Sequence, residues 1–301
     1  METTRPVQGP QEPPDLPGPL RSFQDDPDVA RMLRLERVGG CRILRLIGEG
    51  GMGMVFLAEQ EQPIKRTVAV KIIRLGLDTR QVVSRFQAER QALARMDHPS
   101  IAKVHEAGSS EDGRPYFVME YVPGEPITAF CDRRRLPVRE RLELFREVCR
   151  GVQHAHHKGI LHRDLKPSNI LVAEVDGVPR PKIIDFGVAK SLDPDQQGAT
   201  LLTGSGEFLG TPEYASPEQA GGHDLDTRAD IYALGVLLHE LLLGEVPLAW
   251  ERRSIGGLPR FLERVQAEEP ARPSRRALRL GERAAAVARS EEHTSEIQSP
   301  N

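Results

Sequence analysis

Two polar loops joined by a short apolar hairpin constrain the fold of this chain more than any other feature. The first loop is residues 162–169, His-Arg-Asp-Leu-Lys-Pro-Ser-Asn, and the second begins with Asp-Phe-Gly at residues 185–187. Between them lie two apolar runs, 170–172 and 183–184, and the turn-like pair Asp176-Gly177, a pattern typical of a β-hairpin. The hairpin places the loops side by side, so the sequence predicts one polar site built from both.

The side chains of these loops suit phosphoryl transfer from a nucleotide. Asp164 and Asp185 supply carboxylates, Lys166 an ammonium group and Asn169 a carboxamide. The transfer needs oxygen ligands for a divalent metal, a group that orients the attacking hydroxyl, and positive charge where negative charge develops. All three requirements are met within these few residues.

The order His-Arg-Asp-x-x-x-x-Asn followed by Asp-Phe-Gly resembles the eukaryotic-like protein kinases, and Lys166 and Ser168 are spaced as in their serine/threonine branch. The resemblance implies an α+β, two-lobed fold, with a small β-rich N-lobe and a larger, mainly helical C-lobe. It also implies that Asp164 orients the substrate hydroxyl and accepts its proton while Lys166 steadies the phosphoryl group. Asn169 and Asp185 would hold Mg²⁺, with Mn²⁺ as an alternative ion.

A glycine-rich loop at residues 48–53 lies between two apolar runs, which predicts a strand, a loop and a second strand. Glycine lets backbone N–H groups approach phosphate oxygens closely. Glycine turns join strands in many folds, so this loop alone is a weak signal, but Val55 and the strand 68–71 ending in Lys71 follow at the kinase spacing.

The same resemblance assigns the ATP site in the N-lobe. The residues that cover the phosphates are Gly48, Glu49, Gly50, Gly51, Met52 and Gly53. Val55 and Ala69 would pack on adenine. Lys71 would bind the α and β phosphates and be held by Glu89 on a helix at 84–96, although a solvated helix charge is the ordinary interpretation of Glu89 alone.

A second hairpin is predicted at residues 101–107 and 116–121, around the turn 111–113. The resemblance places Met119 at the back of the adenine pocket and makes the backbone from Glu120 to Val122 its hydrogen-bonding edge. A core methionine is the alternative interpretation of Met119.

The C-lobe should contain helices at 138–157, 226–243 and 258–265, from their apolar spacing. His154, His156 and His157 have no carboxylate or cysteine at a ligand spacing, so we expect no metal there. The polar segment 193–207, followed by Gly-Thr-Pro-Glu-Tyr and Ser-Pro-Glu, resembles an activation segment, with Ser216 where alanine is usual.

Phosphorylation of this segment is expected because Arg163 precedes Asp164, a pairing that in the family supplies a cation for a phosphate on the loop. Thr203 is the first candidate, with Ser205 and Thr200 as the others.

Four regions are predicted along the chain. Residues 1–40 form a proline-rich, disordered leader with a short helix at 26–38; 41–122 form the N-lobe and 123–288 an incomplete C-lobe. Residues 289–301 resemble the translation of a sequencing-library adapter, and we expect them to be non-native.

A net charge of −3 gives no reason to expect nucleic acid as a partner, and no apolar run is long enough for a membrane span. We expect a cytoplasmic kinase that uses ATP and protein substrates, and a membrane anchor beyond residue 288 or a homodimer for autophosphorylation remain open. A pseudokinase scaffold and a small-molecule kinase are the rival interpretations; every catalytic position is filled, and the Ser-Pro-Glu segment that docks a peptide is present.

Overall fold

The computed structural model describes residues 32–33, 35–50, 53–73, 95–186, 211–250 and 257–280. The chain divides into two compact units, Met1–Glu36 and Arg37–Asn301. In the first unit the N–H of Leu35 donates to the carbonyl of Met32 at 3.2 Å. The second unit carries the elements described below.

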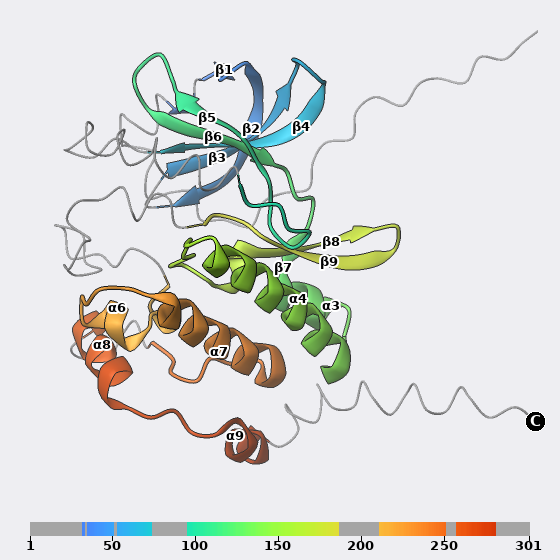
Figure 1. Cartoon of the computed structure of the whole chain (residues 1–301). Coiled ribbons are helices and arrows are strands. Elements are labelled where there is room, and N and C mark those ends of the chain that lie inside the picture. The colour runs from blue at the N-terminus through green and yellow to red at the C-terminus, as the bar shows by residue number, and fades with distance from the viewer. Residues whose placement is uncertain are drawn as a thin grey trace, which may run out of the picture. The chain divides into compact units, whose positions relative to one another are not determined.

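The described residues of the N-lobe form one antiparallel sheet with the strand order β1-β2-β3-β4-β6-β5 (Figure 1). The strands are β1 Arg37–Val38, β2 Cys41–Gly50, β3 Gly53–Gln60, β4 Arg66–Ile73, β5 Val104–Ser109 and β6 Pro115–Glu120. Both predicted hairpins are confirmed. Each strand alternates the side chains it presents to the two faces of the sheet.

The predicted short helix was wrong at its end, because Arg37–Val38 is a strand. Gly39 and Gly40 have φ values of 53° and 71°, the left-handed backbone that a two-residue hairpin turn requires. The turn folds β1 back onto β2, with Val38 opposite Cys41. Two adjacent glycines therefore outweigh the helical spacing that precedes them.

The C-lobe combines helices with a small sheet of order β7-β8-β9. The sheet strands are β7 Glu125–Pro126, β8 Ile170–Val175 and β9 Val178–Ile183; the α-helices are α3 Ile127–Arg133, α4 Val138–His157, α6 Pro217–Ala220, α7 Thr227–Leu243, α8 Gly257–Ala267 and α9 Pro273–Leu280, with 3₁₀ turns η1 Pro167–Asn169 and η3 Pro212–Tyr214. The β8–β9 hairpin and the helices α4, α7 and α8 are confirmed. The helices α3, α6 and α9 were not predicted.

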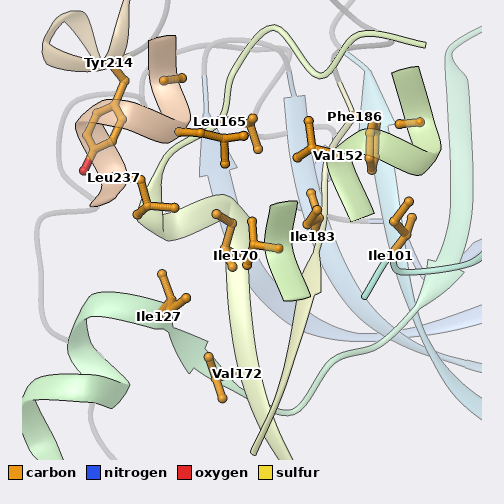
Figure 2. Packing of buried hydrophobic residues seen from close by; sticks show 14 of the residues in the cluster. Ile101, Ile127, Val152, Leu165, Ile170, Val172, Ile183, Phe186, Tyr214 and Leu237 are labelled. Carbon is orange, nitrogen blue, oxygen red and sulfur yellow. The ribbon is translucent and has the colours of Figure 1, made fainter. Parts of the chain in front are cut away.

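One apolar cluster fixes the positions of both polar loops (Figure 2). Leu165, within the first loop, and Phe186, within the second, are buried beside Ile170 and Ile183 of the β8–β9 hairpin. Fully burying such a side chain stabilises the fold by about 1.5–3 kcal/mol. The loops are therefore anchored by apolar residues placed among their polar ones.

A buried arginine joins three helices of the C-lobe. The guanidinium of Arg141 in α4 donates to the carbonyls of Leu136, Leu241 and Cys131 at 2.9, 3.0 and 3.3 Å, and to the carboxylate of Asp132 at 2.8 Å. These acceptors belong to α3, to the link between α3 and α4, and to the end of α7. The guanidinium thus pairs with backbone carbonyls from three segments of the C-lobe, and the bonds to Leu241 and Cys131 are buried.

Replacing Arg141 by methionine should roughly keep the volume of the side chain but remove the donor to the carbonyls of Leu136 and Leu241, at about 1–3 kcal/mol for each. The carbonyl of Cys131 keeps the N–H of Leu136, at 2.9 Å, as its partner. We expect the free energy of unfolding, measured with urea, to fall by several kcal/mol. Arg139→Met, at an exposed site on the same helix, is the matched control and should change little. Equal stability of the two variants would contradict the structural role of Arg141.

Candidate active site

The first polar loop folds onto the carboxylate of Asp164. The ammonium of Lys166 lies 2.9 Å from Asp164 Oδ2, and the amide nitrogen of Asn169 donates to the backbone carbonyl and Oδ2 of Asp164 at 2.8 and 3.1 Å. The 3₁₀ turn η1 places Asn169 there, with its N–H bonded to the carbonyl of Lys166 at 3.0 Å. The structure thus brings three predicted site residues together.

A carboxylate from α7, that of Asp230, hydrogen-bonds to the backbone of this loop. Asp230 accepts the backbone N–H groups of His162 and Arg163, each at 2.8 Å, and lies 2.8 Å from Nε2 of His156 in α4. Burial alone would raise the pKa of Asp230. The hydrogen bond with His156 and the two N–H donors lower the pKa by more than burial raises it, so the pKa of Asp230 is below its usual value. The sequence alone did not predict a role for Asp230 in the site.

His162 connects the two polar loops. Its Nε2–H donates to the carbonyl of Ile184 at 2.9 Å, and its Nδ1 accepts the N–H of Asp164 at 3.3 Å. Complete burial lowers the pKa of His162, which matches the neutral ring that this pair of bonds requires. The N–H of Ile184 also donates to the carbonyl of Asn169 at 2.9 Å, so the predicted juxtaposition of the loops is present.

The second loop meets the N-lobe through an ion pair. The ammonium of Lys71 in β4 lies 2.9 Å from Asp185 Oδ1, and both side chains are largely shielded from solvent. Asp185 has a φ of 58° and Arg163 a φ of 64°, a left-handed backbone that costs non-glycine residues energy and is often found at active sites. The phosphate-binding lysine and the metal-binding carboxylate of the prediction are therefore adjacent.

Strand register collects the residues predicted to bind adenine. Ala69 lies opposite both Leu57 and Met119, while Val55 lies opposite Lys71. Because β4 alternates its faces, Ala69 and Lys71 point to the same side of the sheet.

The glycine loop is constrained most clearly at Gly53. Its φ is 150°, and a Cβ there would lie 2.0 Å from the carbonyl oxygen of Ile72. Only glycine fits this position, whereas Gly50 has open space around it. Gly48 and Glu49 lie near the end of β2, which ends at Gly50 on the other side of the loop.

The predicted hinge contains a further ion pair. The carboxylate of Glu120 lies 2.8 Å from the ammonium of Lys182 in β9 and accepts the N–H of Lys103 at 3.1 Å. This side chain therefore connects β6 to β9.

Several predicted residues lie outside the described parts of the chain, namely Gly51, Met52, Glu89, Thr200, Thr203 and Ser205. Within the described parts, no helix is both long and apolar enough to cross a membrane. The same residues contain no group of three or more His, Cys, Asp or Glu side chains arranged around a metal position. Of the histidine cluster, His156 bonds to Asp230 instead.

Comparison with known proteins identifies the family. Residues 41–280 match the model of the protein kinase domain, and the chain belongs to the protein kinase family. It is 41% identical over 239 residues to serine/threonine-protein kinase pkn3 of Myxococcus xanthus, covering 78% of this chain and 42% of that protein. It is 38% identical over 241 residues to serine/threonine-protein kinase PknA of Mycobacterium tuberculosis (strain H37Rv), covering 78% of this chain and 53% of that protein.

A solved structure agrees with this assignment. The crystal structure of the Mycobacterium tuberculosis PknI kinase domain aligns with a TM-score of 0.54 at 28% identity, covering 83% of this chain and 96% of that one. The chain spans about half the length, or less, of the curated relatives described above.

The variant Asp230→Asn tests whether the carboxylate of Asp230 stabilises the first polar loop. The amide can accept one N–H but presents its own donor to another, so we expect a loss of about 1–3 kcal/mol in the free energy of unfolding at pH 7. Because the folded-state pKa of Asp230 is lowered, its stabilisation is present above about pH 4 and is lost as the pH falls through that pKa. Urea titrations of the two proteins should therefore converge on acidification.

The control is Asp224→Asn, at an exposed site just before α7. It should match the wild type across the whole pH range. A difference between Asp230→Asn and wild type that persisted unchanged into strong acid would contradict the role given to this carboxylate.

Proposed function

We propose that this chain transfers the γ-phosphoryl group of ATP to serine and threonine hydroxyls of proteins. The observation that carries the proposal is the pairing of two clusters, Asp164 with Lys166 and Asn169, and Lys71 with Asp185. Since His162 hydrogen-bonds to both loops, the clusters form one site. Membership of the protein kinase family and the serine/threonine kinases among its relatives support the same reaction.

In this site Asp164 orients the attacking hydroxyl and accepts its proton, and Lys166 places positive charge beside the phosphoryl group in transit. Lys71 binds the phosphates of the nucleotide. Catalysis then comes from positioning and from fixed charges, which is the usual origin of rate enhancement in phosphoryl transfer. Every one of these groups is held by a bond within the described residues.

The donor set fits a divalent cation that is bound together with the nucleotide. The side-chain amide nitrogen of Asn169 donates to Asp164, so its side-chain oxygen and the carboxylate of Asp185 are the oxygen ligands that we assign to the ion. Mg²⁺ typically takes one or two protein oxygens and completes its coordination with phosphate oxygens and water. Bound there, Mg²⁺ or Mn²⁺ would neutralise charge on the phosphates.

Lys71 and Asp164 should be separable by mutation. Lys71→Met should abolish phosphoryl transfer to a protein substrate and leave ATP binding measurable by calorimetry, since the adenine contacts remain. Asp164→Asn should leave ATP binding intact and lower kcat by about 10²- to 10⁴-fold, the usual contribution of a positioned general base. The exposed sites Lys65→Met and Asp97→Asn are the charge-matched controls. Wild-type turnover by Asp164→Asn would exclude the proposed mechanism.

We also expect phosphorylation between residues 191 and 211. A phosphate on Thr203, the first candidate, or on Ser205 or Thr200 would carry nearly two negative charges and form charge-assisted hydrogen bonds to Arg163. Mass spectrometry of the active enzyme should find this phosphate, and Thr203→Ala should lower kcat. An active enzyme that carries no phosphate anywhere in this segment would contradict the prediction.

A further inference from the structure

Gln219, in the short helix α6, makes three hydrogen bonds that use its backbone and both ends of its side-chain amide. Its backbone N–H donates to Ser216 Oγ at 3.3 Å, and its Oε1 accepts the N–H of Ser216 at 3.0 Å. These two bonds form the capping box that begins α6. The third bond leaves the helix: Nε2 donates to the backbone carbonyl of Arg163 at 3.0 Å.

The additional hydrogen bond is made to Arg163, a residue whose backbone conformation needs stabilisation. Its φ of 64° is unfavourable for a side chain of this size, and such a conformation persists only where its surroundings fix it. Asp230 fixes the N–H of Arg163, and Gln219 fixes the carbonyl of the same residue. The carbonyl of Arg163 belongs to the same planar peptide group as the nitrogen of Asp164.

We infer that Gln219 is a positioning residue for the reaction proposed above. It acts through Arg163 to orient Asp164, and it connects α6 to the first polar loop. The inference rests on the proposed function, because its readout is phosphoryl transfer. A purely local role, in which Gln219 only caps α6, is the competing explanation and predicts a loss of stability without a specific loss of turnover.

The amide is well suited to both tasks because it offers a donor and an acceptor. Gln219→Met keeps the length of the side chain and removes both. Gln219→Glu keeps an acceptor for the N–H of Ser216 but, when ionised, presents a second oxygen to the carbonyl of Arg163. Ser216→Ala removes the Oγ acceptor of the cap and leaves the bond to Arg163 in place, so it separates capping from positioning.

The experiment measures kcat, KM for ATP and the melting temperature of the full chain and these variants, with Gln153→Met at an exposed site of α4 as the control. We expect Gln219→Met to lower kcat by about 10- to 100-fold, the cost of a small misplacement of a catalytic group, with KM for ATP unchanged. At a comparable loss of melting temperature, Ser216→Ala should lose far less turnover. Equal losses of kcat in Gln219→Met and Ser216→Ala, or wild-type kcat in Gln219→Met, would overturn the inference.

Gln219→Glu gives a second test that holds even if the methionine variant does not fold. Burial beside a carbonyl raises the pKa of the introduced carboxyl, and its protonated form can donate to Arg163 again. The titratable and charged groups of the neighbouring segments include Arg163, Asp164, Glu218, His223, Arg228 and Asp230, and all are shared with the wild type. The kcat of the variant relative to wild type should rise as the pH falls from about 8 to 5; a constant ratio would overturn the inference. Failure of the proposed function is distinguishable, since the wild type itself would then transfer no phosphate.

Discussion

The arrangement of the first polar loop, residues 162–169, depends on the hydrogen bonds that it makes with the carboxylate of Asp230. This carboxylate pairs two backbone N–H groups, those of His162 and Arg163, that would otherwise be buried without acceptors. It also bonds His156, so α7, α4 and the loop meet at one side chain. An unpaired buried N–H group costs about 1–3 kcal/mol, which is comparable with the cost of holding Arg163 in the left-handed region. Asp230 therefore offsets the strain that the site requires.

A second set of hydrogen bonds connects residues 100–103 with β9, near the proposed nucleotide site. Residues 100–103 lie along β9, where Ile183 accepts the N–H of Ala102 at 2.9 Å and donates its own N–H to the carbonyl of Ser100 at 2.8 Å. The Glu120 to Lys182 ion pair lies alongside. Since β9 ends two residues before Asp185, the strand that leads to the proposed metal-binding carboxylate is tied to the end of β6, where adenine is expected to bind.

Local signals in the sequence predicted the hairpins, three helices and the residues at the centre of the site. The turn pairs and the apolar spacing depend on neighbours a few residues apart, and the resemblance supplied the roles of Asp164, Lys71 and Asp185. The buried functions of Arg141 and Asp230 could not be predicted in the same way, because their partners lie up to 100 residues away in the chain. The helix α3 is only seven residues long and follows Pro126 directly, so its apolar pattern is too short to recognise. At Val38 the helical spacing misled, because the turn at Gly39-Gly40 decided the local structure.

The central claim is that these two loops transfer phosphate to hydroxyl groups of proteins. It is tested most directly by incubating the wild-type chain with γ-³²P-labelled ATP, Mg²⁺ and a generic protein substrate, followed by phosphoamino-acid analysis. The account predicts label on phosphoserine and phosphothreonine, and no transfer once the metal is chelated. Label that appears only as inorganic phosphate or on a small molecule, with none on protein, would contradict it.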